Sequence, residues 1–175
     1  MRLTRTFAAM LMALVFGTAQ RALADGTPPD YTIDLDPGIG CPVFALRIEI
    51  WANPNRVYRE FVGKDTNGEP VRYLDAGKGS TLVFTNLANS REYWVRPNGS
   101  VDHITVNADG TRTWVTSGHY VIVFFPDDSL LPNGEPAGPS TRQYVGQVVW
   151  IENVDSSWTV LKVKGTFNDI CAAIQ

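Results

Sequence analysis

Runs in which apolar and polar residues alternate fill most of this chain, and they limit what it can fold into more than any other feature. In FALRIEIW, residues 44–51, the apolar side chains of Phe44, Leu46, Ile48 and Ile50 share one parity. Alternation with a period of two is typical of a strand that buries one face. Beyond the first 24 residues, no long stretch has the 3.6-residue apolar period of a helix. The sequence therefore predicts an all-β protein.

Turn residues divide the alternating runs into about nine or ten expected strands. Asn67-Gly68, Asn98-Gly99 and Asp109-Gly110 are pairs that readily take the positive φ angles of tight turns. We expect the three segments around Asn98-Gly99 and Asp109-Gly110 to form an antiparallel meander. The expected strands cover residues 44–51, 56–64, 71–77, 80–86, 91–97, 101–107, 111–117, 119–126, 142–152 and 157–165.

Many short strands at close spacing form either a β-sandwich or a closed barrel. We favour an antiparallel β-sandwich with a single domain. Residues 119–126, HYVIVFFP, are almost continuously apolar, which is typical of a central strand buried on both faces. The tail from residue 168 onward is expected to add no more than a turn of helix.

The first 24 residues have the layout of a secretory signal peptide. Arg2 and Arg5 precede an apolar stretch at residues 7–19, and the small-x-small triplet at residues 22–24 ends the segment. The apolar stretch is shorter than the roughly 20 residues that span a bilayer. We therefore expect a cleaved signal and a secreted protein, located outside the cell or in its envelope, with no membrane span.

Cleavage after residue 24 would leave 151 residues, enough for one domain with its own core. Residues 25–40, rich in Pro, Gly and Asp, are expected to form an extended or flexible arm, and residues 41–175 the β-sandwich domain. The chain has 15 basic and 18 acidic residues, and loss of the three leader arginines would give a net charge of −6. An acidic chain without a basic cluster is not expected to bind nucleic acid or an anionic membrane. We expect a monomer.

The two cysteines lie near opposite ends of the predicted domain, Cys41 before its first strand and Cys171 close to the C-terminus. In an exported chain, two cysteines allow one disulfide with a single pairing. It would close a loop of roughly 130 residues, which in the chain-entropy model stabilises the fold by on the order of 5 kcal/mol. The alternative is a pair of free thiols with a catalytic or metal-binding role, although two cysteines alone do not complete a zinc site. We expect the disulfide, and no metal or cofactor.

One long segment without alternation, residues 126–141, separates two of the expected strands and contains four prolines. Loops of this length are uncommon in compact domains unless they act as lids or binding loops. Two interpretations stay open: a variable functional surface, or a plain connection between the sheets.

Three tryptophans, Trp51, Trp94 and Trp114, fall on strand faces that the alternation marks as polar. Each has a charged residue two positions away on the same face. Indoles exposed on a sheet are flat apolar platforms with polar edges, which suit a sugar, a peptide or another protein. The alternative is that loops or the arm cover them, or that a bulge reverses the faces. We take the three tryptophans as candidate binding residues.

Patterns typical of catalysis or metal binding are weak. The chain has two histidines, His103 and His119, and no G-x-S-x-G motif, so a hydrolase triad is not indicated. Several carboxylates are available for glycoside hydrolysis, but the sequence selects no pair. Two acidic segments, at residues 34–38 and 126–128, offer oxygen ligands for calcium, yet neither matches an EF-hand loop. We predict no catalytic residue.

The turns, strands and terminal cysteines form one combined pattern. It consists of CPVFALRI at residues 41–48, TNLAN at 85–89, HITVNADGTRT at 103–113, SGHYVIVFFP at 117–126 and GTFNDICAA at 165–173. This pattern resembles a broad, uncharacterised group of small secreted proteins from actinobacteria, over most of the chain after the leader. The resemblance implies a compact secreted β-sandwich with a cysteine near each end. It brings no activity and no binding residues.

Two classes of function are therefore open. The first is an extracellular or cell-surface binding module whose unknown ligand is a glycan, a peptide or a protein. The second is a small extracellular enzyme or an enzyme inhibitor. A contiguous patch of Trp51, Trp94 and Trp114 would favour the binding module. A cleft that brings His103 or His119 within hydrogen-bond reach of a carboxylate would favour the enzyme. A purely structural envelope or matrix protein is a further alternative and would show neither feature.

Overall fold

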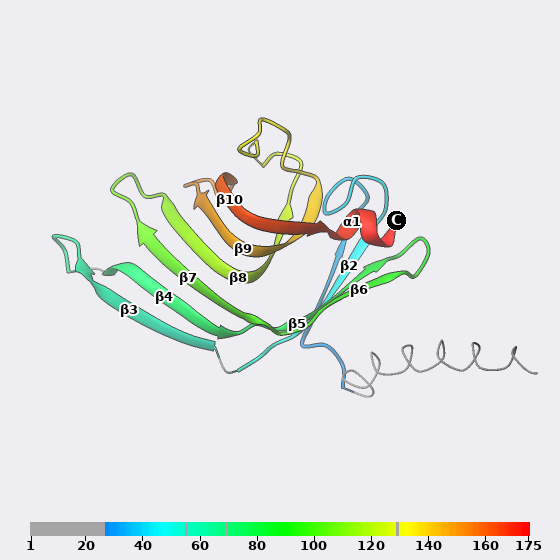
Figure 1. Ribbon diagram of the computed structural model, residues 1–175, viewed down its shortest axis with the longest axis horizontal. Coiled ribbons are helices and arrows are strands. Elements are labelled where there is room, and N and C mark those ends of the chain that lie inside the picture. The colour runs from blue at the N-terminus through cyan, green and yellow to red at the C-terminus, as the bar shows by residue number, and fades with distance from the viewer. Residues whose placement is uncertain (1–26, 55, 69, 129) are drawn as a thin grey trace, which may run out of the picture.

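The computed structural model describes residues 27–175 apart from residues 55, 69 and 129, so the predicted signal peptide lies outside the described residues. The described chain forms two antiparallel sheets that pack together as an all-β sandwich, as the sequence predicts (Figure 1). Its elements are β1 (Tyr31–Leu35), β2 (Leu46–Trp51), β3 (Arg56–Lys64), β4 (Pro70–Lys78), β5 (Thr81–Asn86), β6 (Glu92–Val95), β7 (Gly99–Val106), β8 (Arg112–Phe124), β9 (Ser140–Glu152), β10 (Trp158–Asp169) and α1 (Ile170–Ile174). No helix in this part of the chain is long and apolar enough to cross a membrane.

The two sheets differ in size and shape. One has four strands in the order β1-β2-β5-β6, and the other has six strands in the order β10-β9-β8-β7-β4-β3. The long strands of the six-stranded sheet curve strongly, and β3 and β4 extend beyond the four-stranded sheet (Figure 1). The arm expected at residues 25–40 supplies β1, an edge strand that pairs with β2.

The chain crosses between the sheets at Asn98-Gly99, so the predicted three-stranded meander is wrong at its first turn. β6 ends at Val95 and pairs with β5 in the four-stranded sheet. β7 begins at Gly99 and pairs with β4 and β8 in the other sheet. Pro97 lies between them and has no N–H to continue a ladder, so this segment is a link rather than a tight turn.

The other two predicted turns are hairpins. Gly68, with a φ of 86°, lies in the turn from β3 to β4, and Gly110, with a φ of 87°, lies in the turn from β7 to β8. The two strands expected on either side of Gly118 are one continuous strand, β8. Gly118 has a φ of 107° and bends the strand without ending it.

A row of glycines crosses the six-stranded sheet where its long strands bend. Gly165, Gly146 and Gly118 face one another on β10, β9 and β8, and their φ angles range from 107° to 133°. A Cβ at any of these three positions would come within 2.1–2.4 Å of a carbonyl oxygen on the neighbouring strand. Glycine is therefore required, because other residues would resist both the backbone conformation and the close approach of the strands.

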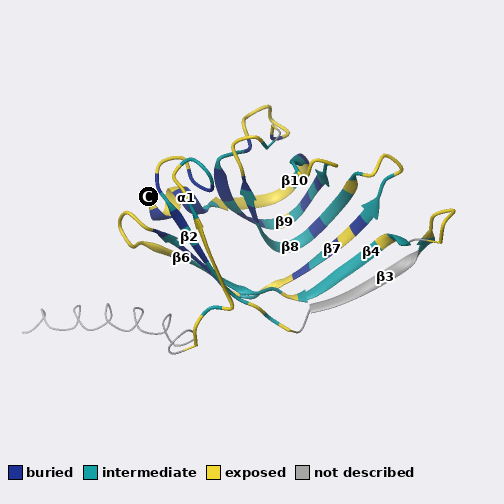
Figure 2. Cartoon of the chain, turned by 180° about the vertical axis from the view of Figure 1, so that it is seen from behind, coloured by how far each residue is buried: buried dark blue, intermediate teal, exposed yellow. Residues whose placement is uncertain are grey.

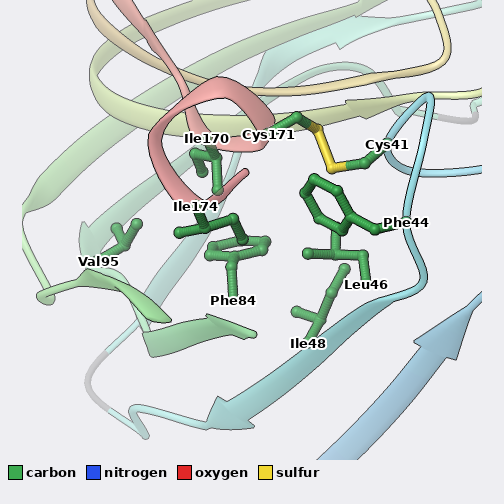
Figure 3. Packing of buried hydrophobic residues seen from close by; sticks show 9 residues of the cluster. All are labelled: Cys41, Phe44, Leu46, Ile48, Phe84, Val95, Ile170, Cys171 and Ile174. Atoms are coloured by element: carbon green, nitrogen blue, oxygen red, sulfur yellow. A yellow bond between two sulfur atoms is a disulfide. The ribbon is translucent and has the colours of Figure 1, made fainter. Parts of the chain in front are cut away.

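The first core lies between the four-stranded sheet and one face of the six-stranded sheet. Val121 and Val123 of β8 pack against it from the six-stranded sheet. The alternating apolar residues from Phe44 to Ile48 belong to it, which confirms the predicted parity of β2. Its buried residues are Cys41, Phe44, Leu46, Ile48, Phe84, Val95, Ile170, Cys171 and Ile174 (Figure 3).

The second core lies on the opposite face of the six-stranded sheet. Ile122 and Phe124 belong to it and alternate with the valines of the first core, so β8 is buried on both faces, as predicted. Figure 2 shows buried residues along β8 and β9 and exposed residues along much of β10. The buried residues of this core are Ile122, Phe124, Leu131, Ala137, Tyr144, Val148, Trp150 and Val160.

The segment at residues 126–139 folds onto the second core through Leu131 and Ala137, which are 7% and 1% exposed. It joins β8 to β9, which are neighbours in one sheet. The interpretation of this segment as a connection between the two sheets is therefore wrong. Part of it is structural, because it supplies side chains to the core.

The predicted disulfide between Cys41 and Cys171 is confirmed. Their Cα atoms lie 5.6 Å apart and the bond spans 130 residues of sequence. Both cysteines are buried in the first core, at 0% and 5% exposure. The bond therefore fastens the start of the domain to the helix α1 at its end.

Side chains of the turn between β5 and β6 close the C-terminal end of α1. Asn86 Nδ2 and Asn89 Nδ2 donate to the carbonyl oxygen of Ile174 at 2.9 Å and 3.2 Å. The guanidinium of Arg91 donates to the carbonyl oxygens of Ala173 and Gln175. Because the last carbonyls of a helix have no partner within it, these bonds fix the tail in place.

Candidate functional site

Two of the three candidate tryptophans lie together on the outer face of the four-stranded sheet. Trp51 of β2 and Trp94 of β6 have ring centroids 6.4 Å apart and ring planes that differ by 13°. On the intervening strand β5, Trp51 lies opposite Thr81 and Trp94 lies opposite Val83. Trp51 and Trp94, the tryptophan pair, are thus diagonal neighbours across β5.

Hydrogen bonds hold both rings of the tryptophan pair, and a buried valine lies between them on the same face of the sheet. Val83 lies on the same face and is only 1% exposed, whereas the two tryptophans are half-buried. Trp51 Nε1 donates to the carbonyl oxygen of Thr27 in the arm at 3.0 Å, and Trp94 Nε1 donates to Glu92 Oε2 at 2.9 Å. Because both ring edges are held, the pair is a preorganised apolar surface.

A salt bridge stands on the same face. The guanidinium of Arg47 donates to both carboxylate oxygens of Asp34 at 2.8 Å. This hydrogen-bonded pair lowers the pKa of Asp34 and raises the pKa of Arg47. Both groups are exposed, so the pair adds little to stability. The guanidinium of Arg47 is therefore already ion-paired within the protein.

Trp114 belongs to a different cluster, on the second-core face of the six-stranded sheet. Its ring stacks on that of Trp150, with centroids 4.7 Å apart, and Trp150 stacks on Trp158 at 4.2 Å. Trp114 Nε1 donates to Glu152 Oε2 at 3.2 Å. Trp114, Trp150 and Trp158 form what we call the tryptophan stack. The prediction that Trp114 lies on an exposed polar face is therefore wrong, because this face of β8 packs against the second core.

A pocket opens beside the tryptophan pair, between the edge strand β6 and the six-stranded sheet. It encloses about 270 Å³ and is lined by Trp94, Arg96, Asn98, His119, Gln143, Val145 and Asn168. Trp94 therefore belongs to both the pair and this pocket, which we name the Trp94 pocket. Its lining has one guanidinium, one imidazole and three amides, and no carboxylate from the described residues.

Tyr93 fixes two of the pocket's amides. Its hydroxyl donates to Gln143 Oε1 at 2.8 Å and accepts a hydrogen bond from Asn168 Nδ2 at 3.2 Å. Gln143 is 9% exposed, so this bond satisfies a buried acceptor. The amide nitrogen of Gln143 remains as a donor for a further acceptor.

Arg96 and His119 are the basic groups of the pocket. Arg96 is exposed and forms no ion pair with any described residue. His119 is half-buried, and its Nδ1 is buried without a hydrogen-bond partner among the residues that the structure describes. An unpaired buried polar atom costs about 1–3 kcal/mol, which a ligand that bonds to it would relieve.

The geometry that would favour an enzyme is not found in this pocket. His103 is exposed on β7 opposite Val115 and does not line the pocket. His119 lines it, but no Asp or Glu in the described chain does so. An imidazole without a carboxylate in the same pocket does not form the acid–base pair that hydrolysis would need.

One carboxylate in each of the two acidic segments has a partner inside the protein. Asp34 pairs with Arg47, as described above. Asp128 accepts hydrogen bonds from the main-chain nitrogens of Phe125 at 2.7 Å and Trp158 at 3.1 Å. Within the described residues, no three or more His, Cys, Asp or Glu side chains are grouped to hold a metal ion. Asp128 instead ties residues 126–139 to the start of β10.

The sequence pointed to Trp94 but missed most of its neighbours. Asn98 lies in the link between the sheets, whereas Gln143 and Asn168 come from β9 and β10. Only the fold brings these segments together. The one local signal was Arg96, which shares the parity of Trp94 two residues away.

Comparison of the sequence with protein-family models finds no match, and comparisons with curated proteins and with solved structures find none either. The resemblance to small secreted actinobacterial proteins therefore stays a prediction. Inference about function has to come from the site itself.

Proposed function

We propose that the protein is an extracellular binding module that recognises a glycan chain at the tryptophan pair and the Trp94 pocket. The observation that carries this proposal is the near-parallel arrangement of two anchored, half-buried indoles, one of which continues into a pocket lined by amides. Aromatic rings match the apolar C–H faces of sugar rings, and amide groups match the hydroxyls at their edges.

An extracellular location is part of the proposal. The buried disulfide between Cys41 and Cys171 is compatible with an oxidising space, where such bonds persist. The predicted signal peptide at residues 1–24 and the resemblance to secreted proteins support the same location. A ligand there would be a cell-surface, cell-wall or matrix polymer.

The experiment is calorimetric titration of the protein, produced from residue 25 onward with its disulfide formed, against cello-, xylo-, chito-, galacturono- and glucurono-hexasaccharides. We expect at least one to bind. Trp94→Ala should weaken that binding by about tenfold or more, because truncating a central aromatic anchor typically costs more than 1 kcal/mol.

Phe125→Ala is the matched control. Phe125 is also an exposed aromatic residue, at 43% exposure, but it lies at the end of β8 and does not line the pocket. Its removal should leave the affinity unchanged. The proposal fails if no glycan of the panel binds, or if the two variants lose affinity equally.

A further inference from the structure

We infer that the glycan bound at the Trp94 pocket is acidic and presents a carboxylate to Arg96, as a chain of uronic acids would. This inference rests on the proposed function and adds to it the charge of the ligand. Three independent features of the pocket support it: its charge, the availability of its guanidinium, and the direction of its hydrogen bonds.

The charge of the pocket is opposite to that of the chain. Acidic residues outnumber basic ones, for a net charge of −3, yet the described lining holds Arg96 and His119 and no acid. Glu92, on the same strand as Trp94, accepts from the indole nitrogen and does not line the pocket. A concave site with one sign of charge concentrates ligands of the other sign.

Arg96 is available to a ligand in a way that Arg47 and Arg112 are not. Arg47 is held by both oxygens of Asp34, and Arg112 lies 3.5 Å from Glu152. Arg96 has no such partner among the described residues. A guanidinium can donate two parallel hydrogen bonds to one carboxylate, which gives both strength and orientation.

Gln143 and Arg96 offer hydrogen-bond donors to a ligand, whereas Asn168, whose Nδ2 donates to Tyr93, also offers its amide oxygen. Tyr93 occupies the amide oxygen of Gln143, which leaves the amide nitrogen as the free end of that side chain. Arg96 can only donate. The Nδ1 atom of His119 lacks a hydrogen-bond partner among the described residues.

An inorganic anion would satisfy the charge but would leave Trp94 without a role. The indole forms one wall of the pocket and continues toward Trp51 on the outer face, so the surface is longer than a single ion. A sugar acid uses both parts, with its ring against the indole and its carboxylate against the guanidinium.

The test uses ligand pairs that differ only in charge. Oligogalacturonate and oligoglucuronate hexamers are each compared with their fully methyl-esterified forms by calorimetry in the same buffer. We expect the acidic member of at least one pair to bind about tenfold more tightly than its ester, because hydrogen bonds to charged groups are worth about one factor of ten or more. Arg96→Gln should remove this preference by lowering the affinity for the acid to that for its ester.

Lys64→Gln is the matched control for loss of one positive charge. Lys64 is exposed at the end of β3, in the hairpin between β3 and β4. This hairpin lies far from β6 and the Trp94 pocket (Figure 1). Its removal should leave the preference intact. Equal affinity for acid and ester, or binding of neutral hexasaccharides only, overturns the inference and leaves the proposed function standing. Absence of binding to every glycan overturns both.

Discussion

The five tryptophans of this chain form two clusters with opposite surroundings. In the tryptophan stack, neighbouring ring centroids lie 4.2 Å and 4.7 Å apart, and the central Trp150 is 1% exposed. Trp150 Nε1 donates to Thr116 Oγ1, a group that is itself buried. In the tryptophan pair, the centroids are 6.4 Å apart and both rings are half-buried.

The two clusters differ in whether they are part of a hydrophobic core. The stack is part of the second core, so its apolar area is buried on folding and stabilises the sheet. The pair lies on the outside of a sheet whose other face already packs on the first core. Its remaining exposed area is therefore free to be buried by a ligand. We infer that the stack serves the fold and the pair serves recognition.

The largest effect expected from this comparison is on stability. Trp150→Ala should lower the free energy of unfolding by about 3–5 kcal/mol, because it leaves a large cavity in a packed core. Trp94→Ala should lower it by about 1 kcal/mol, since the half-buried ring gives up less area and leaves no closed cavity. Urea unfolding followed by circular dichroism, with the disulfide intact, measures both.

Trp150→Phe is the matched variant for this prediction, because it keeps an apolar ring in the same place. It should recover part of the loss. If Trp94→Ala destabilises the protein as much as Trp150→Ala does, the two clusters are not different in kind and the pair is part of the core.

Strand positions could be predicted from the sequence because a half-buried strand carries its own signal. The alternation from Phe44 to Ile50 marks β2 and also places Trp51 on the outer face, as observed. The same reasoning misjudged Trp114. Trp114 lies near the start of β8 and packs against the second core, where its ring stacks on that of Trp150 of β9. That burial depends on distant segments.

Turn residues were predictive only where the turn closes a hairpin. Asp109-Gly110 does so, and Asn98-Gly99 does not, although both pairs have the same local chemistry. Which sheet the next strand joins is decided by packing across the sandwich. Gly118 was read as a break for a similar reason: a glycine inside a strand bends it when the neighbouring strands also have glycine there, as Gly146 and Gly165 do.

The Trp94 pocket was the least predictable part. One of its residues, Trp94, has a parity signal of its own. Gln143 and Asn168 are unremarkable polar residues of β9 and β10 until Tyr93 joins them through its hydroxyl. Such a site comes from the crossing of two sheets, and alternation within one strand carries no information about that crossing.

The β7–β8 hairpin and the β9–β10 hairpin have the same hydrogen bonds in their turns. Each hairpin includes at least one strand that carries the tryptophan stack. Asp109 Oδ1 accepts from the main-chain nitrogen and the hydroxyl of Thr111 at 3.0 Å and 2.7 Å. Asp155 Oδ1 accepts from Ser157 with the same two distances. The hydroxyl bond, followed by the main-chain bond, lowers the pKa of each carboxyl below its usual value of 3.8.

The two hairpins therefore predict a loss of stability in acid. A carboxyl whose pKa is lower in the folded protein stabilises it above the unfolded pKa, and this contribution is lost as the pH falls through the folded value. The double variant Asp109→Asn, Asp155→Asn should flatten the decrease in unfolding free energy between pH 5 and about pH 3. Urea midpoints at each pH measure it, and the affinity of the tryptophan pair for a glycan at pH 7 should not change.

Glu135→Gln is the control for this prediction. It removes an exposed carboxylate of the segment at residues 126–139 whose side chain makes no hydrogen bond with a described residue. It should leave the pH dependence as it is in the parent protein. If the double variant follows the same pH curve as Glu135→Gln, the hairpin carboxyls do not contribute to acid stability.

The smallest expected effect is spectroscopic, and it distinguishes the clusters without perturbing the fold. Acrylamide should quench the fluorescence of the folded protein in a downward-curving Stern–Volmer plot, because half-buried indoles of the pair are accessible and the buried Trp150 is not. Trp94→Phe should reduce the readily quenched fraction, and Trp150→Phe should reduce the shielded one. A bound glycan should protect the first fraction only. A linear plot with the same slope in both variants would mean that the two clusters are equally open to solvent, and the division between a structural stack and a recognition pair would be lost.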